Sequence, residues 1–242
     1  MSTDSVRGDH MQRFWDERAR EDAYFFVDNR LGYGDPDLES FWRGGERGLE
    51  KTLEATGMEI RAADAIVEVG CGVGRLTRPI AARAREVWAI DVSPEMLERA
   101  RGHSPELDNV HWELGDGESL AGIEDASADG CFSLVVFQHI PDPEVVLGYV
   151  REFGRVLRPG GWAAFQVSND PKIHRPPWRM RARATIASWL GRGPRGLSDP
   201  AWLGAAIDLG RLRETALAAG LELERVVGAG TQYCLVGARK TG

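Results

Sequence analysis

From residue 64 onward, the chain alternates short apolar runs with stretches whose apolar residues recur every three or four positions. Runs of this length suit buried strands, and the longer periodic stretches suit amphipathic helices. The predicted strands are residues 65–69, 86–90, 109–114, 130–137, 161–168, 221–228 and 231–238. The predicted helices between them are residues 75–84, 94–102, 143–157 and 208–219. Such alternation indicates a mainly parallel sheet with helices on both faces.

The last two predicted strands have no helix between them. Only Gly228, Ala229 and Gly230 separate them, which is too short for the crossover that parallel neighbours need. We therefore expect an antiparallel hairpin at the C-terminal end of the sheet.

The segment before the sheet, residues 9–56, is predicted to be helical and is rich in aromatic residues. Pro36 suits the first turn of a second helix there, and Gly57 suits its end. The expected fold is α/β: a Rossmann-like, doubly wound, mostly parallel seven-stranded sheet with a C-terminal antiparallel hairpin and an N-terminal helical cap. The cap is expected at residues 1–57 and the core at residues 58–170. A basic helical insertion is expected at residues 171–205, and the C-terminal part of the core at residues 206–242.

Composition narrows the class of protein. The chain has 242 residues, enough to bury a large core, and its net charge of −7 disfavours general nucleic-acid binding. Residues 1–5 are polar, unlike a signal peptide, and no apolar run approaches a membrane span, so we expect a cytoplasmic protein. Cys71, Cys131 and Cys234 are far apart, which predicts buried thiols and no disulfide or metal site.

The strongest chemical signal is the glycine-rich turn after the first predicted strand. Residues 67–75 read Val-Glu-Val-Gly-Cys-Gly-Val-Gly-Arg, with alternate glycines after one carboxylate. A strand that runs into such a turn and then a helix presents backbone N–H groups to a closely bound ligand. A dinucleotide site needs Gly-x-Gly-x-x-Gly, but Arg75 occupies the position of its last glycine.

The pattern acid-x-Gly-x-Gly-x-Gly resembles that of class I S-adenosylmethionine (SAM)-dependent methyltransferases. The order of strands and helices over residues 60–170 and 206–240 is similar to that of the family, including the final hairpin. Residues 157–162, Leu-Arg-Pro-Gly-Gly-Trp, are also typical of it and provide a turn into the fifth strand. The resemblance implies SAM as the cofactor.

The resemblance also implies which residues hold SAM. Asp91 ends the second strand about 20 residues beyond the glycine loop, where an acid accepts both ribose hydroxyls; otherwise it is a solvated or helix-capping aspartate. In the family, an acid at Asp116 accepts from the adenine amino group and the N–H of Gly117 meets the ring, although Gly-Asp-Gly also makes a plain turn. Glu68 is implied to contact the amino group of the methionine part, to be satisfied by loop amides, or both. The further implied contacts are Gly70, Cys71, Gly72, Gly74, Val92, Met96 and Phe137.

The fourth predicted strand leads into residues 138–142, Gln-His-Ile-Pro-Asp, which in the family face the transferable methyl group. They do not form the Asn/Asp-Pro-Pro-Tyr/Phe motif of enzymes that methylate planar nitrogens. His139 is the candidate catalytic residue, because histidine titrates near neutrality and can take a proton from a hydroxyl. Alternatively, His139 only orients its loop.

Two segments outside the core pattern are candidates for the acceptor site. The aromatic residues Trp15, Tyr24 and Phe25 can line it, or simply pack within the cap. Residues 171–197 carry seven basic residues and no acid, and part of the segment reads as an amphipathic helix. We consider a lid that attracts a carboxylate or phosphate, a membrane-surface helix, and a basic face docked on the acidic body. The basic residues are Lys172, Arg175, Arg179, Arg181, Arg183, Arg192 and Arg195; the apolar ones are Trp178, Met180, Ile186, Trp189 and Leu190.

We predict a SAM-dependent methyltransferase that moves a methyl group to an oxygen, or to a nitrogen or carbon, of a small-molecule acceptor, which can be anionic. The alternatives are a methyltransferase of a quinone or lipid head group at the membrane surface, and a non-catalytic SAM-binding regulatory module. A nucleic-acid partner is disfavoured, and a membrane surface stays open without being favoured. No feature of the sequence points to a particular oligomeric state.

Overall fold

The computed structural model describes residues 3–175, 179 and 193–242. Its strands are β1 Ala65–Val69, β2 Glu86–Asp91, β3 Val110–Leu114, β4 Ala128–Ser133, β5 Leu157–Val167, β6 Leu221–Val227 and β7 Cys234–Lys240. Its helices are α1 Thr3–Val27, α2 Leu38–Thr56, α3 Thr77–Ala81, α4 Pro94–His103, the 3₁₀ turn η1 Phe137–His139, α5 Pro143–Val156, α7 Pro200–Leu203 and α8 Leu209–Ala218.

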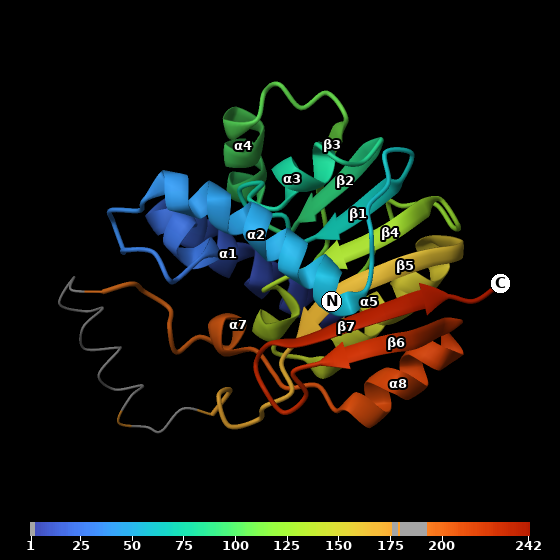
Figure 1. The fold of residues 1–242 in the computed structure, drawn as a ribbon. Coiled ribbons are helices and arrows are strands. Elements are labelled where there is room, and N and C mark those ends of the chain that lie inside the picture. The colour runs from blue at the N-terminus through green and yellow to red at the C-terminus, as the bar shows by residue number, and fades with distance from the viewer. Residues whose placement is uncertain (1–2, 176–178, 180–192) are drawn as a thin grey trace.

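All seven strands form one sheet in the order β3-β2-β1-β4-β5-β7-β6 (Figure 1). Strands β1 to β5 pair in parallel, whereas β7 runs antiparallel to both β5 and β6. The predicted fold class and the predicted hairpin are therefore confirmed.

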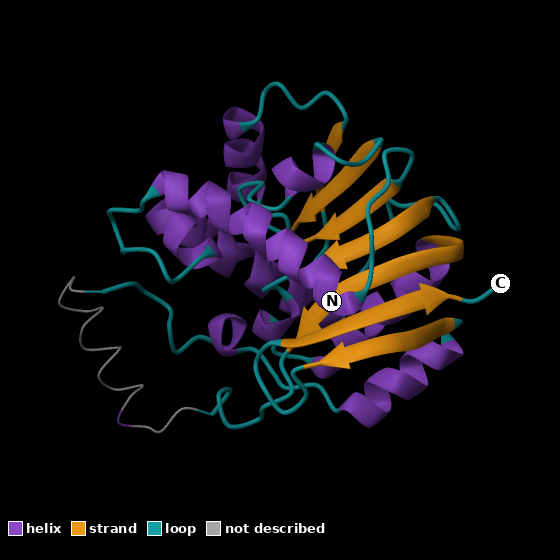
Figure 2. Ribbon diagram, viewed as in Figure 1, coloured by secondary structure: helices purple, strands orange, loops and turns teal. Residues whose placement is uncertain are grey.

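The sheet order reverses between β1 and β4. From β1 the chain builds outward to β2 and β3, then returns to place β4 on the other side of β1. Such a reversal opens a crevice at the carboxyl ends of the strands, where open α/β sheets bind ligands. The arrowheads of these strands point toward α1, so the N-terminal helices lie at this edge (Figure 2).

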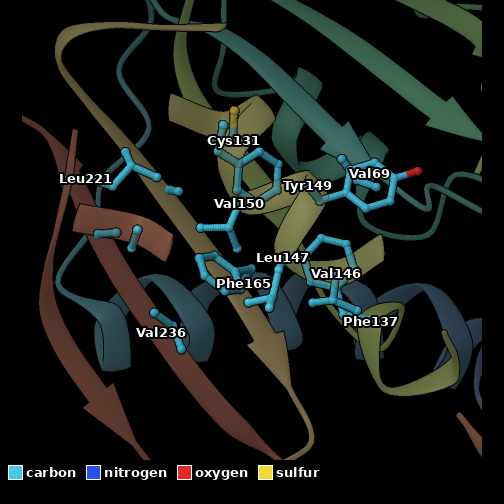
Figure 3. Packing of buried hydrophobic residues seen from close by; sticks show 14 of the residues in the cluster. Val69, Cys131, Phe137, Val146, Leu147, Tyr149, Val150, Phe165, Leu221 and Val236 are labelled. Carbon is cyan, nitrogen blue, oxygen red and sulfur yellow. The ribbon is translucent and has the colours of Figure 1, made fainter. Parts of the chain in front are cut away.

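Each face of the sheet has its own hydrophobic core. On one face, α5 and α8 pack over Phe137, Tyr149 and Phe165 (Figure 3). On the other face, α2, α3 and α4 bury residues such as Leu49 and Ile80 against the strands. Because both faces are covered, β1 is fully buried along its length, including its one charged residue, Glu68. All three cysteines are buried and unpaired, so the prediction that they are buried thiols is confirmed.

The largest difference from the predicted elements lies after β4. The strand predicted over residues 130–137 ends at Ser133, because Val135 turns into the left-handed region with φ +64° and Phe137 begins η1. An apolar run that lines a cavity has the same sequence signature as a buried strand, and residues 134–136 line cavities.

Smaller differences concern turns and helix ends. The helix predicted over residues 75–84 is confined to α3, since the glycine loop turns until Leu76. The loop of the C-terminal hairpin spans residues 228–233 and is longer than the predicted three residues. Pro36 precedes the N-cap Asp37 of α2, so it lies just outside the first turn where we expected it.

The amphipathic helix predicted within part of the basic insertion rests on residues that lie outside the described ones, since residues 176–178 and 180–192 are not described. Its predicted apolar residues lie there, together with Arg181, Arg183 and Arg192. Within the described ranges, no helix has the length and apolarity needed to cross a bilayer.

Helix α2 packs against the glycine-rich loop through a face that bears almost no side chains. A Cβ atom added at Gly45 would lie 2.3 Å from the carbonyl oxygen of Arg75, and one added at Gly48 would touch Leu76 and Leu134. The helix is fixed at both ends, by the Asp37 N-cap and by Gly57 in the left-handed conformation. Glycine on α2 therefore lets the helix axis approach the loop closely.

Replacing Gly45 with alanine tests this contact. The added methyl group would collide with the Arg75 backbone, so we expect Gly45→Ala to lower the free energy of unfolding by about 2 kcal/mol. Gly102→Ala is the matched control, because Gly102 is also helical and an added Cβ meets nothing within 4 Å. The control should gain up to about 1 kcal/mol. Urea unfolding measures both, and equal stability of Gly45→Ala and the parent would refute the close packing.

Candidate active site

A cavity opens at the point where the sheet order reverses, and the loops after β1, β2, β3 and β4 all contribute to its wall. We call it the first cavity. Helix α1 covers it with Met11 and Trp15, and Phe26 and Val27 close one side. Tyr149 of α5 reaches it from the core. The four loops supply backbone polar groups, whereas α1 supplies an apolar cover.

The glycine loop takes a backbone path that side chains would block. Gly70, Gly72 and Gly74 have φ values of +76°, +54° and +85°, a conformation that L residues rarely adopt. A Cβ atom at Gly70 would also lie 2.3 Å from a methyl group of Val136. The loop therefore presents bare backbone to the first cavity while it packs against the β4 loop.

Asp91 ties the glycine loop to the end of β2. One carboxylate oxygen accepts from the Gly72 N–H at 2.8 Å, and the other accepts from the Ser93 N–H at 2.9 Å. Burial raises the pKa of Asp91, while these N–H groups oppose the shift. A carboxylate has about four acceptor positions, so each oxygen keeps one for a further donor in the first cavity.

Glu68 lies buried beneath the glycine loop. One of its oxygens accepts from the Thr77 hydroxyl at 2.6 Å, and the other, Oε1, has no partner among the described residues. The pKa of Glu68 is raised to about 7, chiefly by burial and also by the neighbouring Asp91, against the lowering effects of Thr77 and Arg75. A buried acceptor without a donor is unusual and marks a place for a ligand donor.

Arg75 is buried at the other side of the loop, with 5% of its surface exposed. Its guanidinium lies 3.7 Å from the carboxylate of Asp28 and over the ring of Phe41, while its Nε has no partner among the described residues. Burial lowers the pKa of Arg75 and Asp28 raises it, which leaves an arginine charged at neutral pH.

A second cavity, of about 500 Å³, adjoins the first. It lies between the end of α1, one face of α2, the β4 loop and the C-terminal hairpin. The two cavities share five wall residues, namely Phe26, Val27, Arg75, Leu134 and Val135. Volumes of this size are typical of small-molecule sites.

A chain of side-chain hydrogen bonds fixes the floor of the second cavity. The Val135 N–H donates to Oε1 of Gln166 at 3.0 Å, and the Gln166 amide donates to Oε1 of Gln138 at 2.8 Å. The Gln138 amide in turn lies 3.0 Å from Nε2 of His139, whose Nδ1 lies 2.7 Å from the carbonyl oxygen of Trp202. Since a carbonyl only accepts, Nδ1 carries the proton and Nε2 accepts from Gln138.

Comparisons with known proteins agree with this geometry. A family profile described as a methyltransferase domain matches residues 67–165. The ubiquinone biosynthesis O-methyltransferase of Chromobacterium violaceum is 30% identical over 176 residues, which cover 70% of this chain and 69% of that protein. The chain belongs to the SAM-dependent methyltransferase family. The protein of the same name from Nitrosospira multiformis is 30% identical over 165 residues, 67% of this chain, and the match spans only 64% of that protein.

A solved methyltransferase shares the fold. Phosphoethanolamine N-methyltransferase 1 of Haemonchus contortus, in complex with phosphoethanolamine and S-adenosylhomocysteine, superimposes with a TM-score of 0.70 at 15% identity. The superposition covers 99% of this chain and 50% of that one. At this identity, the comparison establishes a common methyltransferase architecture.

Many of the predicted residues of the methyltransferase site meet at the first cavity. Those that line it are Trp15, Gly70, Cys71, Gly72, Asp91, Val92, Met96 and Gly117. Glu68 and Gly74 are buried within the loop structure, and Phe137 packs in the core beside Tyr149. Tyr24 and Phe25 do not line either cavity.

The two aromatic residues away from the cavities contact other side chains. The Tyr24 hydroxyl lies 2.8 Å from Nε2 of His103, and its ring meets Phe41 edge-on. Phe25 packs edge-on against the rings of Phe26 and Tyr33. These contacts fit the packing interpretation of the aromatic cluster, whereas Trp15 fits the cavity interpretation.

Asp116 forms the turn that its sequence also predicts. Its carboxylate accepts from the backbone N–H groups of Glu118 and Ser119 and from the Ser119 hydroxyl. Burial raises the pKa of Asp116, but these donors outweigh it and the net shift is downward. Gly115 and Gly117 on either side line the first cavity, whereas Asp116 does not.

His139 lines the second cavity and is buried. Burial lowers its pKa to about 4, although the Trp202 carbonyl partly offsets the effect. Its ring packs edge-on against Trp15 at 5.4 Å between centroids and lies 5.0 Å from Trp202. Both ring nitrogens are hydrogen-bonded, so at neutral pH His139 is an uncharged bridge between the β4 loop and α7.

Sequence reasoning missed several residues that line the two cavities. Arg75 entered only as the residue that excludes a dinucleotide motif, yet it borders both cavities. Val135 was assigned to a strand, and its strained backbone conformation has no sequence signal. Arg47 and Lys51 of α2 line the second cavity, and their spacing of four residues on a helix was the available signal.

The raised pKa of Glu68 predicts a pH-dependent stability. A carboxyl whose pKa rises on folding, here from 4.5 to about 7, stabilises the fold while protonated, and this contribution is lost as the pH rises through that window. We therefore expect Glu68→Gln to gain on the order of 3 kcal/mol relative to the parent between pH 4.5 and pH 8. The glutamine keeps an acceptor for Thr77.

Urea unfolding of the ligand-free protein across this pH range measures the difference. Glu98→Gln is the control, since Glu98 is an exposed acid on α4 and should give parallel stability curves for variant and parent. A pH-independent difference for Glu68→Gln would contradict the raised pKa.

Proposed function

We propose that this protein transfers the methyl group of SAM to an oxygen atom of a small-molecule acceptor. The observation that carries the proposal is the junction of two cavities, one built from the glycine loop and Asp91, the other large enough for an acceptor. When bound, SAM supplies a methyl group on a sulfonium, which an acceptor oxygen can attack. The protein must then align the acceptor and keep water away.

The residues of the first cavity fit SAM in both its parts. Asp91 has acceptor positions left for two ribose hydroxyls, and the backbone at Gly117 lies on the wall where adenine would lie. The amino-acid part of SAM carries one positive and one negative group. Glu68, with an unpaired buried oxygen, and Arg75, with an unpaired Nε, supply the opposite charges at the glycine loop.

Side chains at the junction of the cavities would exclude water from the transfer. Phe26, Val27, Leu134 and Val135 are apolar and shared by both walls. An acceptor in the second cavity would meet the first cavity across these groups. Alignment and dryness are what methyl transfer chiefly requires of a protein, because the reactive group comes with the cofactor.

The choice of oxygen rests on the curated relatives, which are named as O-methyltransferases. Their names also refer to ubiquinone biosynthesis, so a quinone-type phenol belongs in an acceptor screen. A non-catalytic SAM-binding module would leave the second cavity without a use. Transfer of a labelled methyl group to any acceptor in a screen of hydroxylated compounds would exclude that module.

We assign His139 a positioning role rather than that of a base. Its only lone pair accepts from Gln138, and a group with a pKa near 4 holds protons poorly at neutral pH. Its two hydrogen bonds instead hold the β4 loop against α7, and so fix the wall that the two cavities share.

Titration with S-adenosylhomocysteine tests the cofactor site. We expect micromolar binding by the parent protein and an affinity about 10- to 100-fold lower for Asp91→Ala, the range for losing charged hydrogen bonds. Isothermal titration calorimetry measures both, with NAD as a negative control. Thermal unfolding of Asp91→Ala checks that the variant is folded, since Asp91 also joins two loops. Tight binding of NAD, or unchanged affinity in Asp91→Ala, would contradict the assignment.

The variant His139→Gln tests the positioning role, using the best acceptor from the screen. We expect kcat/KM to fall by less than about tenfold, with the acidic limb of its pH profile unmoved, whereas loss of a general base costs about 100- to 10,000-fold. Steady-state assays between pH 5 and pH 9 give both quantities. A fall in that larger range, with loss of the acidic limb, would make His139 the base.

A further inference from the structure

The lining of the second cavity is positively charged although the protein is acidic. The described residues of its wall include four cationic side chains and one carboxylate, in a chain of net charge −7. The cationic residues are Arg30, Arg47, Lys51 and Arg75, and the carboxylate is that of Asp28. A cavity whose charge opposes that of the whole molecule selects its contents by charge.

The carboxylate of Asp28 is already paired. It accepts from Nε of Arg30 at 2.7 Å and from Nη2 of Arg30 at 2.5 Å, and Nη1 of Arg75 lies 3.7 Å away. Burial raises the pKa of Asp28, but the two arginines outweigh it and hold the pKa below its usual value. Asp28 therefore stays ionised and is shared between Arg30 and Arg75, so it compensates neither Arg47 nor Lys51.

Arg47 and Lys51 lie one turn apart on α2, and neither side chain forms an ion pair or hydrogen bond with any described residue. Their neighbours on the same helix behave differently. Arg43 lies 3.3 Å from Glu39, and Glu50 is engaged by Arg83 at 3.0 Å. The nearby acids are thus partly taken, and the two cations that face the second cavity are the ones without partners in the described part of the chain.

The apolar side chains of the second cavity lie mainly where it adjoins the first. Arg47 and Lys51 stand on α2 beside Gly44 and Gly48. Leu134 and Val135 belong to the part of the wall shared with the first cavity, which also includes Arg75 beside the carboxylate of Asp28. An acceptor with a charged end and an apolar, hydroxyl-bearing body would match both surfaces in a single orientation.

We propose that the second cavity binds the methyl acceptor through an anionic group, a carboxylate or a phosphate monoester, held by Arg47 and Lys51. This inference rests on the proposed function for the identity of the ligand as acceptor, but the anion site itself does not require transfer. The arginine can engage two oxygens of the group in a fork, and the lysine adds a point charge one helical turn away. The body of the acceptor then extends toward the junction of the cavities.

The test compares two probes of nearly the same shape, the anionic 7-hydroxycoumarin-3-carboxylate and its uncharged carboxamide, 7-hydroxycoumarin-3-carboxamide. Fluorescence anisotropy gives the Kd of each for the full chain, with and without saturating S-adenosylhomocysteine. We expect the carboxylate to bind at least about tenfold more tightly, the lower end of the range for charged hydrogen bonds, and less tightly at high salt. Competition by benzoate and by phenyl phosphate then ranks the two anionic groups.

The double variant Arg47→Gln/Lys51→Gln should abolish the preference for the carboxylate, and each single variant should reduce it. Arg43→Gln is the matched control, because Arg43 is on the same helix but does not line the cavity. Both altered residues are exposed, so thermal unfolding should match that of the parent. Equal affinity for the two probes, absence of binding up to millimolar concentration, or a preference that survives in the double variant would each overturn the proposal.

The outcomes separate this inference from the proposed function. Failure to bind S-adenosylhomocysteine, with the carboxylate preference intact, would remove the methyltransferase role and leave the anion site. Binding of S-adenosylhomocysteine and turnover of uncharged acceptors, without a carboxylate preference, would do the reverse. Methylation of the coumarin hydroxyl, followed with labelled SAM, would support both together.

Discussion

The carboxylate of Asp91 holds together the two loops on which the site depends. By accepting from Gly72 and Ser93, it fixes the glycine loop against the end of β2 and the start of α4 at the same time. The loop also packs inward through Cys71, Val73 and Leu76, and the N–H groups of Gly70 and Cys71 donate to the carbonyl oxygen of Ile90. Close packing from outside completes its support. Val136 presses on one side and the bare face of α2 on the other.

Acidic and basic groups lie on opposite sides of the glycine loop, although the protein as a whole is acidic. Two acids, Glu68 and Asp91, lie on the sheet side of the loop, while a buried arginine lies toward α2. Glu68 repels Asp91, and its Oε1 has no partner among the described residues. Burying the carboxyl of Glu68 and the guanidinium of Arg75 without full hydrogen bonding costs free energy, and a zwitterionic ligand would satisfy both groups together. The electrostatic arrangement thus favours the ligand-bound state over the free one.

Sequence patterns predicted the fold well because its strands are short apolar or alternating runs with helices between them, and because the glycine loop is a local motif. They also placed Gly70, Asp91 and Gly117 at one cavity, since the carboxyl ends of adjacent parallel strands must meet at one edge. The acceptor side was not predictable in this way. It joins Arg47 on α2 with Gln166 on β5 and the β4 loop, and no local pattern links segments so far apart.

Val135 illustrates a conflict between folding and selectivity at one position. A β-branched residue with φ +64° is rare, and holding it costs on the order of 1–3 kcal/mol. Glycine would relieve this strain, but it would also remove the isopropyl group that both cavities share as part of their wall. The strain at Val135 is therefore the energetic cost of holding an isopropyl group at the place where the two cavities meet.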